Sequence, residues 1–177
     1  MIELCFPWIG VAVGRNEHGD PLHPSVLTLE QLILRFGRGK RNEKRVVFTN
    51  GCFHLLHPGH IKLLEAARAL GDVLVVGLNS DRSMQQLKGL SSSFIPQAER
   101  AEILANLEAV DAVVIFDEPT PLNLISALLP DVLVKGADWR DKRVVGREEV
   151  EAAGGRVELI DVVLGYSTTE IVRKVRA

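Results

Sequence analysis

Short runs of apolar, β-branched residues alternate with helical patterns along most of this chain. The apolar runs are Val46–Thr49, Val73–Leu78, Ala112–Phe116, Val132–Val134 and Val157–Ile160. Each is almost entirely apolar, as in strands that are buried on both faces of a parallel sheet. Apolar residues recur at helical spacing between them, over Ile61–Leu70, Ala98–Leu107, Leu122–Leu129 and Glu148–Ala153. The alternation predicts an α/β protein with a doubly wound, Rossmann-like sheet of five parallel strands and helices on both faces.

The first 44 residues follow a different pattern. A short helix is predicted to begin at Thr28, because Thr28 and Gln31 have the spacing of a capping box. Residues 37–41, Gly-Arg-Gly-Lys-Arg, indicate a polar linker. We therefore expect an N-terminal extension with a short helix over residues 1–44, followed by the α/β domain over residues 45–177.

The composition fits a soluble globular protein, since 46% of the 177 residues are hydrophobic and 25% are charged. The net charge of −2 gives no basic excess, so neither nucleic acid nor an anionic membrane is expected as a partner. The two cysteines, Cys5 and Cys52, form no disulfide framework, which favours a reducing, cytoplasmic location. Residues 1–13 are rather apolar, but they are too short to span a bilayer and make a poor signal peptide.

Polar segments follow all five predicted strands. In a doubly wound sheet, ligands bind outside the carboxyl ends of the strands, near the point where the strand order reverses. These segments are Asn50–His60, Asn79–Asp81, Phe116–Asp117, Lys135–Asp138 and Tyr166–Thr169. Their convergence on one edge of the sheet predicts a ligand site there.

The segment His57-Pro58-Gly59-His60 lies between the first predicted strand and an apolar helix. Two imidazoles three residues apart at a helix start share one face, where unpaired backbone N–H groups also point outward. Gly59 adds no side chain, so a ligand can approach the backbone closely. The pattern predicts a site for a polyanion such as the phosphates of a nucleotide. A zinc site made by Cys52, His54, His57 and His60 is the alternative interpretation.

Several of these segments resemble a known family. Thr49-Asn50-Gly51-Cys52-Phe53, followed by the two histidines, is similar to the HxGH signature of the cytidylyltransferase-like nucleotidyltransferases. Within that family, Val76–Asp81, Leu87–Gly89, Leu133–Asp138 and Gly165–Ile171 resemble the bacterial D-glycero-β-D-manno-heptose 1-phosphate adenylyltransferases. Those enzymes make ADP-heptose for lipopolysaccharide and related glycans. The resemblance covers about residues 27–176.

The resemblance implies that residues 45–177 form a nucleotidyltransferase domain that transfers AMP from ATP to heptose 1-phosphate and releases pyrophosphate. Mg²⁺ is expected to be held largely by the substrate phosphates, without protein metal ligands. A homodimer is expected, with a separate kinase supplying the sugar 1-phosphate. Two alternatives stay open: a cytidylyltransferase acting on glycerol 3-phosphate or another alcohol phosphate, and a nucleotide-binding module without catalytic activity.

The same resemblance assigns the candidate site residues. Catalytic roles are expected for His57, His60, Lys88 and Arg100, which would donate hydrogen bonds or supply positive charge to the phosphates. Nucleotide binding is expected for Thr49, Asn50, Gly51, Cys52, Phe53, Gly59, Asn79, Asp81, Lys135, Gly136, Asp138, Tyr166, Ser167, Thr168 and Thr169. The segment Ser167–Glu170 also has the spacing of a simple capping box, which is the alternative reading of its role.

The chain departs from the family pattern at a few positions. His54 stands where the family has Asp after the Phe, a change expected to alter metal handling, sugar preference or pH dependence. Ser92 and Ile95 take the places of an Arg and an Asn, which predicts a remodelled substrate loop. Ala137 and Trp139 replace a Gly and an aromatic residue, and Trp139 is expected to form a wall of the pocket.

Overall fold

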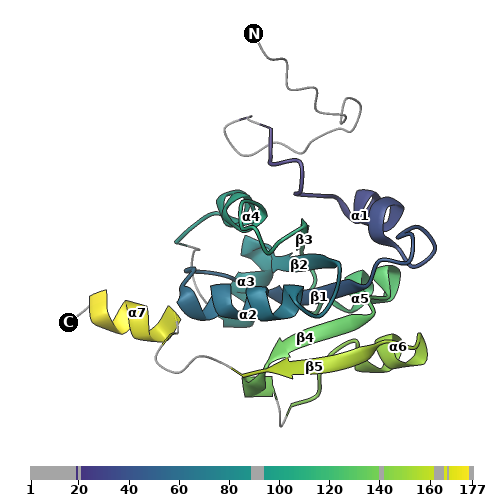
Figure 1. The fold of residues 1–177 in the computed structure, drawn as a ribbon. Coiled ribbons are helices and arrows are strands. Elements are labelled where there is room, and N and C mark those ends of the chain that lie inside the picture. The colour runs from purple at the N-terminus through teal and green to yellow at the C-terminus, as the bar shows by residue number, and fades with distance from the viewer. Residues whose placement is uncertain are drawn as a thin grey trace.

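Five parallel strands form one sheet in the order β3-β2-β1-β4-β5 (Figure 1). The computed structural model describes residues 19, 21–88, 94–139, 142–161, 166 and 168–175, except the side chains of Lys88, Asp138 and Thr169. The strands are β1 (Val46–Gly51), β2 (Val73–Asn79), β3 (Ala112–Phe116), β4 (Val132–Gly136) and β5 (Arg156–Ile160). The predicted fold class is confirmed, because each apolar run of the sequence forms one strand of a doubly wound sheet.

The helices are α1 (Leu29–Phe36), α2 (Pro58–Arg68), α3 (Asp81–Lys88), α4 (Gln97–Ala105), α5 (Leu122–Leu128), α6 (Arg147–Ala152) and α7 (Thr168–Val175). A short 3₁₀ turn, η1, spans Ala137–Trp139. The sequence pattern did not predict α3, whose eight residues include few apolar ones. Among the described residues, no helix combines the length and apolarity that crossing a bilayer requires.

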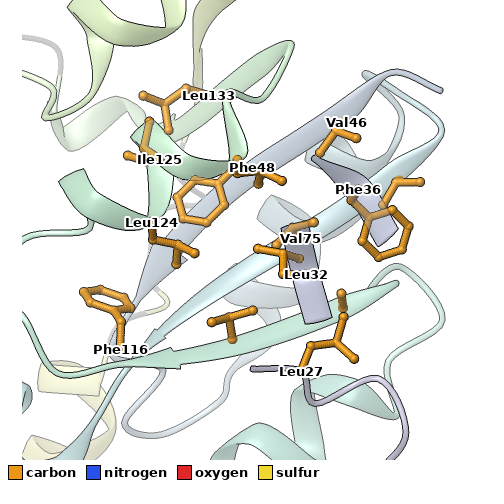
Figure 2. Packing of buried hydrophobic residues seen from close by; sticks show 14 of the residues in the cluster. Leu27, Leu32, Phe36, Val46, Phe48, Val75, Phe116, Leu124, Ile125 and Leu133 are labelled. Atoms are coloured by element: carbon orange, nitrogen blue, oxygen red, sulfur yellow. The ribbon is translucent and has the colours of Figure 1, made fainter. Parts of the chain in front are cut away.

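Two apolar clusters pack on opposite faces of the sheet. Residues of α1, α5 and α6 join one cluster, and residues of α2 and α4 join the other. Figure 2 shows part of the first, in which Leu32 and Phe36 of α1 and Leu124 and Ile125 of α5 meet side chains of the sheet. Burial on both faces explains why β1, β2 and β4 are apolar throughout most of their length.

The segment before α1 covers the outer edge of β3. Val26 and Val113 form a parallel bridge, and the Leu27 amide donates to the Val113 carbonyl at 2.8 Å. The predicted capping box is confirmed, since Thr28 accepts from the Gln31 amide and the Gln31 side chain accepts from the Thr28 amide. This pairing protects an edge strand that would otherwise present open hydrogen-bonding groups.

Part of the predicted polar linker is buried. Only 7% of Arg41 is exposed, and its guanidinium donates to Asp131 at 2.8 Å and to the Leu129 carbonyl at 3.0 Å. Asp131 also accepts from the Val46 amide at 2.8 Å. A polar linker would be exposed to solvent. Arg41 is instead buried, because its charge is paired with the carboxylate of Asp131, 90 residues further along the chain.

The strand order reverses between β1 and β4, so their carboxyl ends form the switch point of the sheet. Figure 1 shows α7 on the side toward which β4 and β5 point. The loop from β1 to α2 and the turn after β4 therefore meet at the edge where the sequence predicted a ligand site.

Candidate functional site

A cavity of about 570 Å³ lies at this switch point. Its lining comes from the loop after β1, the start of α2, the ends of β2, β4 and β5, the loop after β3, and the start of α7. Its size and its place in the sheet are those of a small-molecule site in a doubly wound protein. The lining residues are Thr49, Asn50, Gly51, Cys52, Phe53, His54, His57, Gly59, His60, Leu63, Asn79, Leu87, Pro119, Thr120, Pro121, Lys135, Gly136, Trp139, Val145, Asp161, Tyr166 and Thr168.

The rings of His57 and His60 are stacked on each other at the start of α2. Their centroids are 3.8 Å apart and their planes differ by 18°. His57 is the N-cap residue in extended conformation, and Pro58 begins the helix. Phe53, whose φ is +45°, supports the pair from behind, with its ring centroid 5.1 Å from that of His60. The predicted convergence of both imidazoles on one side of the helix start is therefore present.

Gly59 leaves the space that the His57 ring fills. A β-carbon at this position would lie 3.0 Å from His57 Nδ1 and 3.2 Å from the Tyr166 β-carbon. Both distances are tighter than nearly all β-carbon contacts, so a side chain here would push its neighbours by a few tenths of an ångström. Glycine therefore suits the close approach of two cavity-lining side chains.

The surroundings of His57 favour the neutral form of its ring. Burial lowers the pKa of His57 below the ordinary histidine value, and a hydrogen bond of its own backbone offsets part of that effect. Its Nδ1 is buried and has no hydrogen-bond partner among the described residues. A neutral imidazole can donate one hydrogen bond to an anionic oxygen.

A buried cation lies across the switch point from the histidines. Lys135 is 5% exposed, and its ammonium donates a hydrogen bond to the Asn50 side chain. The strand register explains this contact. Thr49 of β1 pairs with Val134 of β4, so the next residues of the two strands, Asn50 and Lys135, lie side by side. The Lys135 ammonium also lies 5.0 Å from the centre of the Trp139 ring. A lysine held between an amide and an indole supplies a fixed positive charge to the cavity.

Arg100 connects the loops that support the cavity. Its side chain is 1% exposed and donates to the carbonyls of Cys52, Asn79 and Ile95. It also pairs with Asp81 at 2.7 Å. Neither Arg100 nor Asp81 lines the cavity, and the second Asp81 oxygen accepts from the Gln97 amide at 3.0 Å. The geometry therefore gives this ion pair a positioning role.

His54, the residue that departs from the family pattern, faces the cavity and is 4% exposed. Its Nε2 accepts a hydrogen bond from the Phe94 amide at 3.1 Å. The two rings are stacked, with centroids 4.8 Å apart and planes within 9°. Since an amide N–H is only a donor, this bond requires His54 Nε2 to be unprotonated. His54 therefore ties the start of the segment before α4 to the loop after β1.

The structure gathers most of the predicted site residues around one cavity. It places there His57, His60, Thr49, Asn50, Gly51, Cys52, Phe53, Gly59, Asn79, Lys135, Gly136, Tyr166 and Thr168, together with the predicted wall residue Trp139. Ser167 and the side chains of Lys88, Asp138 and Thr169 lie outside the described part of the chain, as does Ser92. The alternative capping role of Ser167 lies there too.

Sequence reasoning missed several lining residues. Asp161 directly follows β5, and Pro119, Thr120 and Pro121 follow β3. The rule that ligands meet the carboxyl ends of strands applies to these positions as well, so it was a signal that pointed to them. Leu87 was missed for a different reason, because it belongs to α3, which the pattern did not predict.

The arrangement does not support the zinc alternative. Within the ranges that the structure describes, no three His, Cys, Asp or Glu side chains gather as a group able to hold a metal ion. The stacked rings of His57 and His60 do not converge on a common point in the way that tetrahedral ligation requires. Cations that accompany a phosphate substrate would instead be held mainly by that substrate.

The sheet and its switch-point cavity define an α/β protein of the nucleotide-binding type. A family model described as cytidylyltransferase-like matches residues 48–174, which include every lining residue of the cavity and all of the sheet except the first two residues of β1. This chain belongs to the cytidylyltransferase-like family.

Curated relatives agree with this assignment. The chain is 61% identical over 137 residues to the bifunctional protein HldE of Geotalea uraniireducens, covering 77% of this chain and 28% of the relative. It is 55% identical over 149 residues to HldE of Koribacter versatilis, covering 84% and 31%. HldE of Acidiphilium cryptum is 49% identical, with 96% and 36% covered. The chain thus spans about a third of the length of these relatives.

Solved structures share the fold. A lipopolysaccharide core biosynthesis protein from Thermoplasma volcanium matches with a TM-score of 0.55 and 24% identity, over 68% of this chain and 97% of that one. Pantoate-beta-alanine ligase from Francisella tularensis matches with a TM-score of 0.55 and 15% identity, over 77% of this chain and 67% of that one. At these identities the likeness concerns the arrangement of the sheet and its helices.

Proposed function

We propose that this chain is a nucleotidyltransferase that joins ATP and D-glycero-β-D-manno-heptose 1-phosphate to give ADP-heptose and pyrophosphate. The observation that carries the proposal is the stacked pair of His57 and His60 facing the switch-point cavity. Membership of the cytidylyltransferase-like family and the high identity to proteins named HldE support the same activity.

In this reaction an oxygen of the sugar phosphate attacks the α-phosphorus of ATP. A new P–O bond forms there, and the bond from the α-phosphorus to the bridging oxygen of the β-phosphate breaks, so pyrophosphate leaves with the electron pair. The attacking oxygen is already anionic, so the chemistry needs no general base. The protein has to align the reactants and stabilise negative charge on the α-phosphoryl group and the leaving group.

The cavity contains groups suited to each of these tasks. His57 and His60 are proposed to donate hydrogen bonds to the α-phosphoryl group, where charge grows in the transition state. The Lys135 ammonium supplies fixed positive charge from the opposite side of the switch point. Thr168, at the first position of α7, is proposed to bind the leaving pyrophosphate together with the unpaired amides of that helix end.

The metal enters as part of the substrate, MgATP. Asp161 is the carboxylate that lines the described cavity, which leaves Mg²⁺ to be coordinated chiefly by phosphate oxygens and water. We propose in addition that the protein acts in the cytoplasm as a homodimer. Sedimentation of the purified chain tests the dimer.

The experiment that tests the function is a pyrophosphate-release assay. It uses ATP, CTP, GTP and UTP, each with heptose 1-phosphate, other sugar 1-phosphates and glycerol 3-phosphate, and identifies the products by mass spectrometry. The proposal predicts turnover with ATP and heptose 1-phosphate and a product with the mass of ADP-heptose. A preference for CTP with an alcohol phosphate would replace it by the cytidylyltransferase alternative, and ATP binding without turnover would indicate an inactive module.

A further inference from the structure

A second cavity, of about 510 Å³, lies at the opposite end of the sheet from the site described above. It is formed around the amino ends of β1, β4 and β5 and the loop that follows α1. The lining residues are Arg38, Arg41, Glu43, Lys44, Arg45, Asp131, Gly154, Gly155 and Arg156. This cavity shares no lining residue with the switch-point cavity.

The charge of this basic cavity is opposite to that of the whole chain. Five of its lining residues are Arg or Lys and two are Asp or Glu, which makes a formal charge of 5 − 2 = +3 in a protein whose net charge is −2. The carboxylate of Asp131 is already engaged, with one oxygen bound to Arg41 and the other to the Val46 amide. Arg156 is paired as well, with Glu158 at 2.7 Å, so the excess positive charge of the cavity is carried by Arg38, Lys44 and Arg45 against Glu43.

Two of the arginines repel each other. Burial lowers the pKa of the Arg41 guanidinium, the positive charge of Arg38 lowers it further, and the charge of Asp131 opposes both effects. Among the described residues, neither Arg38 nor Lys44 has a hydrogen bond or an ion pair from its side chain. An anion bound in the cavity would offset the repulsion between Arg38 and Arg41. It would also give Arg38 and Lys44 a partner.

The loop that carries these cations is held in a costly conformation. Asn42 and Glu43 are consecutive non-glycine residues with φ of +48° and +62°, in the left-handed region that L-residues rarely occupy. The Lys44 amide donates to the Arg41 carbonyl at 3.0 Å and closes the bend. Such conformations persist where the surrounding structure enforces them, and they are frequent at ligand sites. Here the bend places Arg41 inside the protein and leaves Lys44 at the rim.

We propose that this basic cavity is a second anion site that binds a phosphate-bearing ligand, inorganic phosphate or pyrophosphate. No aromatic residue is among its described lining residues, so there is no platform on which a base would stack. Guanidinium groups bind phosphate oxygens in paired hydrogen bonds, which suits the exposed side chain of Arg38. The two cavities share no lining residue, so the test of this anion site does not depend on whether the proposed function is correct.

The test is an NMR titration of the full ¹⁵N-labelled chain with sodium phosphate and then sodium pyrophosphate, at constant ionic strength. Amide signals of Asn42–Lys44 and Gly154 report on the basic cavity, and those of Gly51 and Gly59 report on the switch-point site. The double variant Arg38→Gln/Lys44→Gln removes two unpartnered cations. The double variant Arg143→Gln/Arg147→Gln removes the same charge from exposed positions outside either cavity.

The proposal predicts saturable shifts at Asn42–Lys44 and Gly154, with pyrophosphate binding more tightly than phosphate. The apparent affinity should fall by about tenfold or more in Arg38→Gln/Lys44→Gln and stay unchanged in the Arg143→Gln/Arg147→Gln control. Shifts at Gly51 and Gly59 should persist in both variants. Equal shifts with sodium chloride, or an unchanged affinity in Arg38→Gln/Lys44→Gln, would overturn the proposal.

Discussion

The absent side chain of Gly59 sets the position of the His57 ring. A β-carbon on residue 59 would approach His57 Nδ1 to 3.0 Å, and the same ring is stacked at 3.8 Å on His60. Any displacement of His57 therefore changes the pair of groups that we expect to face the α-phosphate. Gly59 lies within α2, where alanine is tolerated by the helix itself. A loss of activity on its replacement can therefore be told apart from a loss of folding.

We expect Gly59→Ala to lower turnover measurably, by up to about tenfold, because the added β-carbon pushes the His57 ring out of its place and catalysis depends on the alignment of the reacting groups. Its stability should be unchanged or slightly higher, since alanine favours a helix over glycine by roughly 0.5–1 kcal/mol. Steady-state kinetics and thermal unfolding measure the two effects. Gly39→Ala is the matched control, because a β-carbon there meets open space. Equal activity of Gly59→Ala and the native protein would contradict the role given to the His57 ring.

His60→Ala removes one of the two proposed donors. We expect the turnover number to fall by roughly 10²–10³, as when one donor to a developing oxyanion is lost, while the affinity for ATP falls much less. Kinetics and direct ATP binding measure this difference. Lys62→Gln, on an exposed part of the same helix, controls for changes in α2. A parallel loss of binding and turnover would indicate a structural role for His60.

The lowered pKa of His57 predicts proton uptake when ATP binds. In the protein without ATP, burial holds the pKa of His57 below the ordinary histidine value of about 6.5. The negative phosphates of bound ATP would favour the charged ring and so raise the pKa of His57. Near pH 6 the native protein should take up more protons with MgATP than His57→Gln does. Calorimetry in buffers of different ionisation enthalpy measures this difference. Identical uptake in both proteins would show that His57 does not face the phosphates.

The lowered pKa of His57 also makes the stability of the folded protein depend on pH. Below about pH 6.5 the unfolded chain protonates His57 before the folded protein does, because the folded pKa is lower. The free energy of unfolding of the native protein should therefore fall as the pH drops below that value. The fall should be smaller in His57→Gln, which has no titrating ring, and denaturant unfolding at a series of pH values measures it.

His54 lines the switch-point cavity and is expected, from the family resemblance, to stand in place of an Asp. His54→Asp keeps an acceptor for the Phe94 amide but removes the stacked ring. We expect the KM for the sugar phosphate and the pH profile to change, because a carboxylate replaces the stacked ring whose Nε2 accepts from the Phe94 amide. Kinetics between pH 5.5 and 8 with several acceptors test this. If rate, pH profile and acceptor choice are all unchanged, position 54 has no functional role.

Arg100→Ala tests the positioning role of a residue that the family resemblance marks as catalytic. Removing the guanidinium leaves Asp81 and the carbonyls of Cys52 and Asn79 without their donor. We expect a loss of roughly 1–3 kcal/mol in the free energy of unfolding, because the carbonyls of Cys52 and Asn79 lose a buried hydrogen-bond donor, while Asp81 stays partly exposed to water. Arg100→Lys should lose less, since it keeps the charge. Native stability with strongly reduced turnover would instead favour direct contact with substrate.

Hydrophobic periodicity was sufficient to predict the sheet, because strands buried on both faces are apolar almost without interruption. The same periodicity did not predict helix α3, because this helix has few apolar residues. Met84 is buried and Leu87 is half exposed. Arg41 escaped this reasoning as well. Its burial depends on Asp131, and no local pattern connects a basic run with a carboxylate so far along the chain.

The site was predictable where strands end and where motif residues are adjacent in sequence. His57, Gly59 and His60 are neighbours, so local helix geometry already places them together. Long-range partners were not predictable in this way. The bond between Asn50 and Lys135 depends on the pairing of β1 with β4, and the bonds of Arg100 depend on three loops that meet only in the folded protein.

The most direct test is a crystal structure of the protein with Mg²⁺ and the non-hydrolysable analogue α,β-methylene-ATP. Our account predicts that the α-phosphate lies within hydrogen-bonding distance of the His57 and His60 rings, with the Lys135 ammonium facing the phosphates from the other side of the cavity. A complex in which both rings turn away from the nucleotide, or in which they enclose a zinc ion, would contradict it.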